Sequence, residues 1–423
     1  MEISQLYALY SKSFLVSTDT RKIIPNSIFF GLKGDHFNGN AFAEEAIHRG
    51  AAYAIVDEQK FVTNDRIFLV KNVLKALQEL ATFHRRQLAI PIIALTGSNG
   101  KTTTKELINA VLSKKYKTTA TLGNLNNHIG VPLTLLAMTP QTELGIVEMG
   151  ANHLKEIEFL CVVTEPDYGY ITNFGKAHLE GFGSLKGVIK GKSELYDYLR
   201  KHDKKAFINA NDVKQLEMTK GLTRISFGDV LADVKIAMMH ANPFVSLKYR
   251  TSIIQSQLIG AYNFNNIAAA ITIGNYFKVD DTLIIEAIEN YIPSNNRSQI
   301  IQKGSNKIIL DAYNANPSSM EAALENFSAL ADGNKMVILG DMFELGEVAK
   351  EEHQRIADLA IQLNLNKVYL LGDNFYQVNK EEVHRFRTFE EFKNFLSGQS
   401  IENATILIKA SRGMALERIV DLL

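Results

Sequence analysis

The chain contains 423 residues, which is too many for one hydrophobic core and predicts about three domains. Acidic and basic residues balance at 46 each, so the composition favours neither nucleic acid nor an anionic membrane as a partner. The single cysteine, Cys161, excludes an intrachain disulfide and a cysteine-based zinc site. Without a signal-peptide pattern or a long apolar run, we expect a cytoplasmic protein.

The first 88 residues predict a small α/β unit. Its strands are expected at 27–32, 52–57 and 67–70, and its helices at 41–48 and 73–87. The segment Ala89-Ile90-Pro91 then leads into a new strand, and we place a domain boundary there.

Residues 89–293 open with the most informative stretch of the chain. An apolar segment at 92–95 precedes Thr96-Gly97-Ser98-Asn99-Gly100-Lys101-Thr102-Thr103-Thr104, and an amphipathic pattern begins at residue 105. A strand, a glycine turn, Lys-Thr and a helix start are the parts of a phosphate-binding loop, in which Lys101 meets the outer phosphates and Thr102 can hold Mg²⁺. The strict pattern would place a glycine at Leu95, so the loop is a shortened variant. A plain glycine turn is the alternative, and the flanking strand and helix favour phosphate binding.

The rest of this middle stretch repeats the alternation of strand and helix. Strands at 144–149 and 168–173 predict a parallel sheet covered by helices. Short alternating segments at 224–258 predict a β-rich excursion, and helical periodicity returns at 261–277 and 281–291.

Three residues of the middle stretch are candidates for chemistry. Glu148 ends a strand and can reach a metal held on phosphates, whereas an ordinary loop acid is the alternative. His178 follows another strand end, and the residues alone leave a ligand role and a structural role about even. Lys192 lies in an apolar helical stripe, so it either snorkels to the surface or is held in a cleft, where desolvation would make it a nucleophile able to capture CO₂. On the residues alone, snorkelling is favoured.

Asparagines gather in three segments. The segment 123–130, with Asn124, Asn126 and Asn127, is polar and turn-like, and suits a polar ligand. Asn263, Asn265 and Asn266 open a helix, where simple N-capping is the alternative. Asp311-Ala312-Tyr313-Asn314-Ala315-Asn316-Pro317 ends a strand, and capping of the next helix explains Asn316 without a function.

Residues 294–423 predict a Rossmann-like unit without a Gly-x-Gly-x-x-Gly fingerprint. Its strands are expected at 307–311, 336–340, 368–372 and 405–409, and its helices at 317–330, 349–363 and 389–396.

Taken together, these segments closely resemble the Mur ligase family, whose members form amide bonds with ATP during the synthesis of peptidoglycan precursors. The matching segments are 96–104, Glu148, Asn173 with His178, Lys192-Ser193-Glu194, 260–266, Arg297 and Asp311. Segments 123–127, 311–320, 339–346 and 409–414 are similar to the branch that joins D-alanyl-D-alanine to UDP-N-acetylmuramoyl-tripeptide.

The resemblance implies an ADP-forming ligase with a UDP-precursor-binding domain at 1–88, an ATP-binding domain at 89–293 and an amine-substrate domain at 294–423. It implies ATP and Mg²⁺ as cofactors, with a CO₂-derived carbamate on Lys192, and we expect a monomer. The implied catalytic residues are Lys101, His178 and Lys192. The implied metal ligands are Thr102, Glu148, His178 and carbamylated Lys192. The implied ATP contacts are Gly97, Ser98, Asn99, Gly100, Lys101, Thr102, Thr103, Asn263, Asn266, Arg297 and Asp311. Contacts to the UDP precursor are implied for Thr20, Arg21, Asn124, Asn126 and Asn127, and contacts to the amine substrate for Asn314, Asn316, Asp341, Ser411 and Arg412.

Two departures from the family pattern affect binding residues. Tyr262 replaces the more usual histidine before Asn263, and Asn38-Gly39-Asn40 stands where Asp-Gly-His is common. Two other functions stay open: a ligase similar to folylpolyglutamate synthase, and a nucleotide-dependent switch without synthetic chemistry. The asparagine-rich segments argue against the first, and the absence of Asp-x-x-Gly and Asn-Lys-x-Asp, the GTPase signatures, argues against the second.

Overall fold

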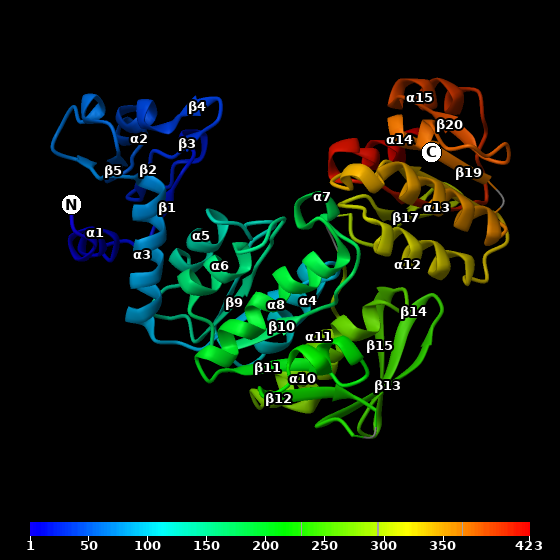
Figure 1. The fold of residues 1–423 in the computed structure, drawn as a ribbon, viewed down its shortest axis with the longest axis horizontal. Helices are drawn as coiled ribbons and strands as arrows, with labels where there is room; N and C mark the ends of the chain where they lie inside the picture. The colour runs from blue at the N-terminus through cyan, green and yellow to red at the C-terminus, as the bar shows by residue number, and fades with distance from the viewer. Residues whose placement is uncertain (230, 294–295, 366) are drawn as a thin grey trace.

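The computed structural model describes residues 1–229, 231–293, 296–365 and 367–423. Three sheets of four, nine and six strands organise the chain, and a two-stranded ribbon accompanies the first. We name the three parts built on these sheets the N-terminal, central and C-terminal units. Figure 1 shows the N-terminal unit in blue at the upper left and the C-terminal unit in yellow to red at the upper right, with the cyan and green central unit between and below them. The predicted α/β class with three parts is confirmed, while the boundary at 293/294 adjoins residues 294–295, outside the described residues.

The N-terminal unit has a parallel sheet with strand order β1-β2-β5-β6. Its elements are α1 (Ile3–Tyr10), β1 (Val16–Ser17), β2 (Ile28–Phe30), β3 (Lys33–Gly34), β4 (Phe37–Asn38), α2 (Ala43–His48), β5 (Tyr53–Val56), β6 (Ile67–Leu69) and α3 (Val73–Leu88). Helix α3 begins at Asn72, whose side chain accepts a hydrogen bond from Lys75 N, and it ends at Ala89 in the left-handed conformation. The predicted strands and helices are present, and α1 is an additional helix that the sequence did not predict.

Helices α1 and α3 belong to the same hydrophobic core as the central sheet. The apolar face of α3, with Leu77 and Leu80, joins a buried cluster that also contains Ile92 and Val131. Tyr10 of α1 donates its hydroxyl hydrogen to Leu136 O at 2.7 Å. The central unit therefore packs directly on the two helices that flank the first sheet.

The central unit holds the nine-stranded sheet, in the order β15-β14-β13-β12-β11-β10-β7-β9-β8. Its strands are β7 (Ile92–Thr96), β8 (Thr118–Ala120), β9 (Leu144–Glu148), β10 (Tyr168–Ile171), β11 (Lys205–Asn209), β12 (Thr223–Gly228), β13 (Val234–Ala241), β14 (Phe244–Tyr249) and β15 (Ser252–Ile259). Its helices are α4 (Lys101–Leu112), α5 (Gly130–Leu136), α6 (Glu156–Thr164), α7 (Leu179–Phe182), α8 (Leu185–Lys201), α9 (Val213–Met218), α10 (Asn263–Tyr276) and α11 (Asp281–Glu289). Along the sheet from β8 to β13, which includes β7, neighbouring strands pair in parallel, whereas β13, β14 and β15 pair antiparallel. The antiparallel part confirms the predicted β-rich excursion.

Successive residues of the central strands point to opposite faces of the sheet. Ile92 and Ala94 of β7 pack in one buried cluster with α5, α6 and α8, whereas Ile93 and Leu95 pack in the other with α4, α10 and α11. This double cover makes the central strands almost continuously apolar, as in parallel sheets generally.

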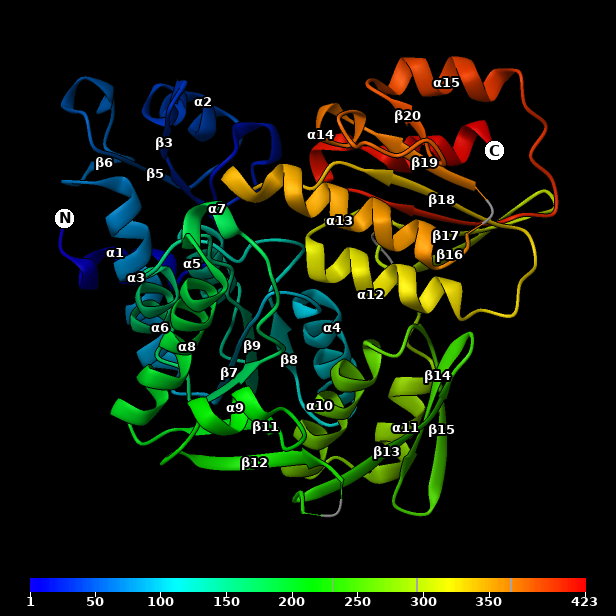
Figure 2. The same cartoon turned by 45° about the vertical axis from the view of Figure 1, so that its right-hand side comes forward.

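The C-terminal unit has strand order β16-β17-β21-β18-β19-β20, with only β16 antiparallel to its neighbour. Its elements are β16 (Gln299–Lys303), β17 (Asn306–Asp311), α12 (Pro317–Ser328), β18 (Lys335–Gly340), α13 (Ala349–Gln362), β19 (Lys367–Leu371), α14 (Asp373–Tyr376), β20 (His384–Phe386), α15 (Phe389–Ser397) and β21 (Thr405–Lys409). In Figure 2, α12 and α13 cover one face of this sheet and α15 covers the other, in agreement with the two buried clusters. Across the described residues, no helix has the length and apolar character needed to cross a membrane.

Candidate functional site

A cavity of about 1220 Å³ lies between the central and C-terminal units. Strand ends from both sheets reach it: Glu148 ends β9, Asp311 ends β17 and Lys409 ends β21. The predicted site residues that line it are Ser98, Asn99, Gly100, Lys101, Thr102, Thr103, Asn126, Asn127, Glu148, His178, Asn263, Asn266, Arg297, Asp311, Asn314 and Asn316. The structure thus brings together most of the selected residues, which come from seven separate stretches of the sequence.

The turn between β7 and α4 has a backbone shape that requires glycine. Gly97 has φ of +142°, and a Cβ atom there would lie 2.0 Å from Thr172 Oγ1. Gly100, with φ of +77°, precedes the first residue of α4, so the helix N-terminus opens at Lys101. Lys101 Nζ donates to Gly97 O at 2.8 Å, and burial lowers the pKa of this lysine. The turn has the form of an anion cradle. The side chain of Lys101 bends back and contacts the backbone of the same turn.

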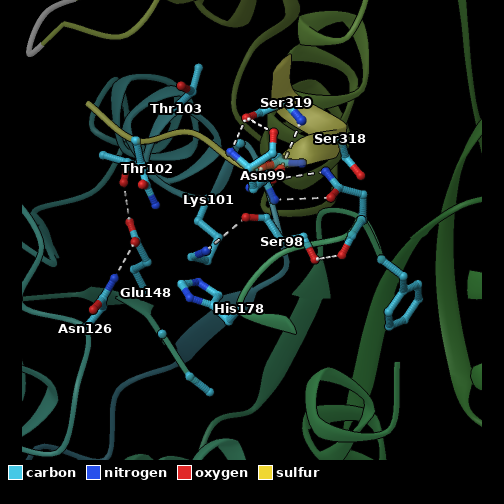
Figure 3. A pocket seen from close by; sticks show the side chains of 18 of the residues that line it. Ser98, Asn99, Lys101, Thr102, Thr103, Asn126, Glu148, His178, Ser318 and Ser319 are labelled. Atoms are coloured by element: carbon cyan, nitrogen blue, oxygen red, sulfur yellow. Dashed lines mark hydrogen bonds between the residues drawn. The ribbon is translucent and has the colours of Figure 1, made fainter. Parts of the chain in front are cut away.

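Glu148 is held at the cavity by two donors. Thr102 Oγ1 donates to its Oε2 at 2.9 Å, and Asn126 Nδ2 donates to its Oε1 at 2.8 Å, as Figure 3 shows. The Glu148 side chain is buried, and a carboxylate and a hydroxyl are the oxygen donors that Mg²⁺ prefers. Among the described residues, no group of three or more His, Cys, Asp or Glu side chains could hold a metal ion without other ligands. The donor set fits a cation that also takes ligands from phosphates and water.

His178 contacts the C-terminal unit. Its Nδ1 lies 2.5 Å from Oε2 of Glu344, and this hydrogen bond lowers the pKa of the Glu344 carboxyl. Asn173, at the end of the same strand segment, accepts from Asn99 N through Oδ1 at 3.1 Å and donates to Asn99 O at 3.0 Å. The loop after β10 therefore supports the phosphate-type turn on one side and touches the C-terminal unit on the other.

Lys192 is completely buried in α8, so the snorkelling that the residues alone favoured is wrong. Its Nζ donates to Ala151 O at 3.0 Å and lies 5.2 Å from the centroid of the Phe182 ring. Burial lowers its pKa well below the ordinary lysine value, with the positive charge of Lys101 as a further cause. Lys192 does not line the cavity, but Ala151, its hydrogen-bond acceptor, does.

Arg297 and Asp311 form the C-terminal wall. The Arg297 guanidinium stacks 3.6 Å from the centroid of the Tyr313 ring, and its buried Nε has no hydrogen-bond partner among the described residues. Asp311 accepts from Lys409 Nζ at 2.5 Å and from Ser298 N at 3.1 Å. An unpaired buried donor on a cation at a cavity wall suits an anionic ligand.

The asparagines at the start of α10 are bonded within the protein. Asn263 donates to Ile259 O at 2.8 Å, and Asn266 bridges Asn263 and Thr104. The neighbouring Tyr262 donates to or accepts from Ser298 Oγ at 2.9 Å. Asn266 does more than cap the helix, because its side chain packs against Gly100 of the turn. A Cβ atom at position 100 would lie 2.6 Å from Asn266 Oδ1, so this contact leaves room only for glycine.

The remaining predicted residues lie away from the cavity. Arg21 pairs with Asp19 on the surface of the N-terminal unit, next to Thr20, and Asn124 is exposed in the loop before α5. Asp341 accepts from the backbone nitrogens of Asn374 and Phe375, and Ser411 accepts from Phe343 N. Arg412 pairs with Glu417 and lies 5.9 Å from the centroid of the Tyr313 ring. Gly97 is not among the residues that line the cavity, although its neighbour Ser98 is. Roles for these residues stay predictions.

Sequence reasoning assigned no role to four residues that shape the site. Lys409 holds Asp311, Tyr313 stacks on Arg297, Ser318 accepts from Lys176 N at 2.8 Å, and Glu344 contacts His178. The position of Lys409 at a strand end was a usable signal, since carboxyl ends of parallel strands meet at a ligand crevice. For the contacts of Ser318 and Glu344 no local signal existed, because their partners lie more than 140 residues away.

Comparisons with known proteins agree with this architecture. Residues 14–92 match the Mur ligase family catalytic domain, 95–274 the Mur ligase middle domain, and 296–412 the Mur ligase glutamate ligase domain. The UDP-N-acetylmuramoyl-tripeptide–D-alanyl-D-alanine ligase of Bacillus subtilis (strain 168) is 33% identical over 96% of this chain and 92% of its own. Crystal structure I of MurF from Acinetobacter baumannii superposes with a TM-score of 0.86, at 31% identity over 96% of this chain and 92% of that one. A MurF ligase from Thermotoga maritima in complex with ADP gives a TM-score of 0.84, at 26% identity over 96% of both chains.

These matches extend over all three sheets and over the turn, strand ends and loops that surround the cavity. With one-third identity across nearly its whole length and three consecutive domain matches, the chain belongs to the Mur ligase family.

Proposed function

We propose that the chain is an ATP-dependent ligase that adds D-alanyl-D-alanine to UDP-N-acetylmuramoyl-tripeptide and releases ADP and phosphate. The observation that carries the proposal is the anion cradle at 97–102, which faces Arg297 across one cavity in a chain similar over its whole length to ligases of that name. The asparagine-rich loop at 123–127 supports this choice over a ligase similar to folylpolyglutamate synthase.

The reaction brings anions together in two steps. The terminal carboxylate of the tripeptide attacks the γ-phosphorus of ATP, and the bond to the β,γ-bridging oxygen breaks, so that an acyl phosphate and ADP form. The amine of D-alanyl-D-alanine then attacks the acyl carbon, loses a proton, and expels phosphate to leave the amide. Lys101 and Arg297 both line the cavity, and we assign them to hold the phosphates and reduce the repulsion between the reacting groups.

Thr102 and Glu148 are the residues that would hold Mg²⁺, because they present a hydroxyl and a carboxylate beside the phosphate turn. When bound, the ion neutralises phosphate charge and orients the phosphates. His178 and a carbamate on Lys192 are proposed as ligands for a second ion.

The proposal of a carbamate rests on the burial of Lys192. Burial lowers the pKa of this lysine and so favours the unprotonated amine, whose lone pair can attack CO₂ to form a carbamate with release of one proton. Lys192→Ala should therefore lose activity that added short-chain carboxylic acids partly restore. Normal ligation by the variant without these acids would contradict the carbamate.

The two substrates are assigned to different sets of residues. The UDP precursor is assigned to Thr20, Arg21, Asn124, Asn126 and Asn127, and the amine substrate to Asn314, Asn316, Asp341, Ser411 and Arg412. A monomer in the cytoplasm is part of the same proposal.

The decisive experiment measures phosphate release with UDP-muramoyl peptides, each with and without D-alanyl-D-alanine. Release that requires both substrates supports the proposal. Release with pteroyl-glutamate and glutamate would favour the folylpolyglutamate alternative, and turnover that needs no acceptor at all would favour a nucleotide-dependent switch. Tripeptides ending in diaminopimelate and in lysine, tested in parallel, identify the third residue.

A further inference from the structure

Two residues with unusual backbones meet where the central and C-terminal units touch. Glu344, in the turn between β18 and α13, has φ of +61°, and His178, just before α7, has φ of +53°. Residues other than glycine adopt this left-handed region at a cost, and such outliers concentrate at functional positions. The two residues come from different sheets and are 166 positions apart.

The contact between them is fixed by backbone as well as side chain. Glu344 Oε2 lies 2.5 Å from His178 Nδ1, and Glu344 O accepts from Glu180 N at 3.1 Å. Lys176 Nζ lies 2.5 Å from Glu352 Oε1 on α13, so a second ion pair joins the same loop to the same unit. These contacts hold the His178 ring and the Glu344 carboxylate side by side where the two units dock.

This geometry decides which ring nitrogen carries hydrogen. An ionised carboxylate only accepts hydrogen bonds, so His178 Nδ1 must be the N–H donor. In a neutral imidazole the lone pair then lies on Nε2, which is left for ligands in the cavity that His178 lines. Carboxylates play this part for metal-binding histidines in many proteins.

We propose that Glu344 is a positioning residue, supplied by the C-terminal unit, that sets the tautomer and orientation of His178 for the site in the central unit. The two units must dock before His178 presents Nε2, so docking and readiness of the site are linked. The inference deepens the proposed function and relies on it only for its activity measurement.

An exposed ion pair without this role is the alternative. The Glu344 side chain is 47% exposed, and exposed pairs contribute little to stability. The alternative predicts that loss of the carboxylate leaves the ring hydrogen where it was.

The test is the ¹⁵N spectrum of the histidine side chains in the full-length protein without ligands, at pH about 8.5, about two units above the value for a histidine in a model peptide. Loss of one signal in His178→Asn assigns the resonance. The wild type should show hydrogen on Nδ1, and Glu344→Ala should shift the ring toward the Nε2–H form. Glu344→Gln, which keeps an acceptor oxygen, should retain the wild-type pattern. Glu347→Ala, at an exposed carboxylate in the same turn, is the matched control and should change nothing.

Two spectra would overturn the inference: a wild-type His178 with hydrogen on Nε2, or an unchanged ring in Glu344→Ala. The activity measurement tests whether the tautomer matters for the reaction. The kcat of Glu344→Ala should fall about 10–100-fold, whereas the kcat of Glu344→Gln should stay close to that of the wild type. If the ring responds as expected but no UDP-muramoyl peptide is ligated by the wild type, the proposed function fails and the positioning role stands. An altered ring with undiminished kcat would overturn the link to the site.

Discussion

Replacing Lys192 with methionine should stabilise the protein while removing its activity. Methionine has a similar length and no charge, and it fits a position that is fully buried in α8. The amino group contacts Ala151 O at 3.0 Å and lies 5.2 Å from the Phe182 ring centroid, and neither contact supplies a negative charge; the charges of Glu156 and Glu194 offset burial only in part. A buried lysine without such compensation is a cost to the folded state.

The size of the gain follows from two opposing contributions. Apolar replacement of buried ionic groups is often neutral or stabilising by about 1–4 kcal/mol. Loss of the hydrogen bond to Ala151 removes about 0.5–1.5 kcal/mol. The difference is a net gain of up to about 3 kcal/mol in the free energy of unfolding near neutral pH.

The extra stability of the Lys192→Met protein should decrease as the pH rises. Burial lowers the pKa of Lys192 below the value in the unfolded chain, which is about 10.4. Between these two pKa values the unfolded chain binds more protons than the folded one, so wild-type stability from this group rises with pH. The methionine variant lacks the group, so its advantage is greatest below the folded-state pKa and vanishes above pH about 10.4.

Urea unfolding followed by circular dichroism, in CO₂-free buffer at pH about 7 and about 10, measures both effects. Lys190→Met, an exposed position on the same helix, is the matched control and should stay within about 0.5 kcal/mol of wild type. A Lys192→Met protein less stable than wild type at pH about 7 would refute the reasoning, as would an advantage that fails to shrink at the higher pH.

Three further substitutions test the site and its supports. Gly97→Ala should abolish nucleotide binding in calorimetry, because φ of +142° and a Cβ atom 2.0 Å from Thr172 Oγ1 are both incompatible with the turn; near-normal affinity would contradict this. Thr102→Val should lower the free energy of unfolding by about 1.5–3 kcal/mol, because the charged Glu148 carboxylate loses a hydrogen bond. It should also raise the Mg²⁺ concentration needed for half-maximal ADP formation, and an unaltered Mg²⁺ dependence would count against the ligand role of Thr102. Asn316→Ala should cost about 0.5–2 kcal/mol in thermal unfolding through loss of the α12 cap, in addition to the hydrogen bond that Asn316 donates to Asn99; Asn316→Asp keeps the cap and loses only that donor, so it should cost less, and equal losses would argue that the cap contributes nothing.

The sequence was sufficient where function and local structure use the same residues. The turn at 97–102 was predictable because a glycine with positive φ, a helix start and a phosphate cradle all require the same spacing. Strand ends such as Glu148 were predictable because parallel strands alternate with helices and bring their carboxyl ends to one edge.

The sequence did not predict features that depend on tertiary packing or that lack local end signals. The apolar stripe around Lys192 belongs to a helix that packs on the sheet, and periodicity cannot tell a lysine at the margin of that stripe from one at its centre. The short helix α1 was missed because its eight residues have no acidic first turn or basic last turn to mark the ends. The contact of His178 with Glu344 depends on how two separate sheets dock, which local patterns do not encode.

The docking itself is held by contacts of modest strength. Asn316 Nδ2 donates to Asn99 Oδ1 at 2.7 Å, and Lys176, with 41% of its side chain exposed, pairs with Glu352. Hydrogen bonds of this kind contribute about 0.5–1.5 kcal/mol each, and exposed ion pairs about 0–1 kcal/mol. Together these two contacts contribute about 0.5–2.5 kcal/mol. That is less than the roughly 4 kcal/mol of a ligand bound with a Kd of about 1 mM. A ligand that touches both walls of the cavity can therefore shift the equilibrium between docked and separated units, and loss of that ligand as product can release them. The contacts that bring the C-terminal unit to the site are thus weak enough for a ligand-dependent separation of the two units.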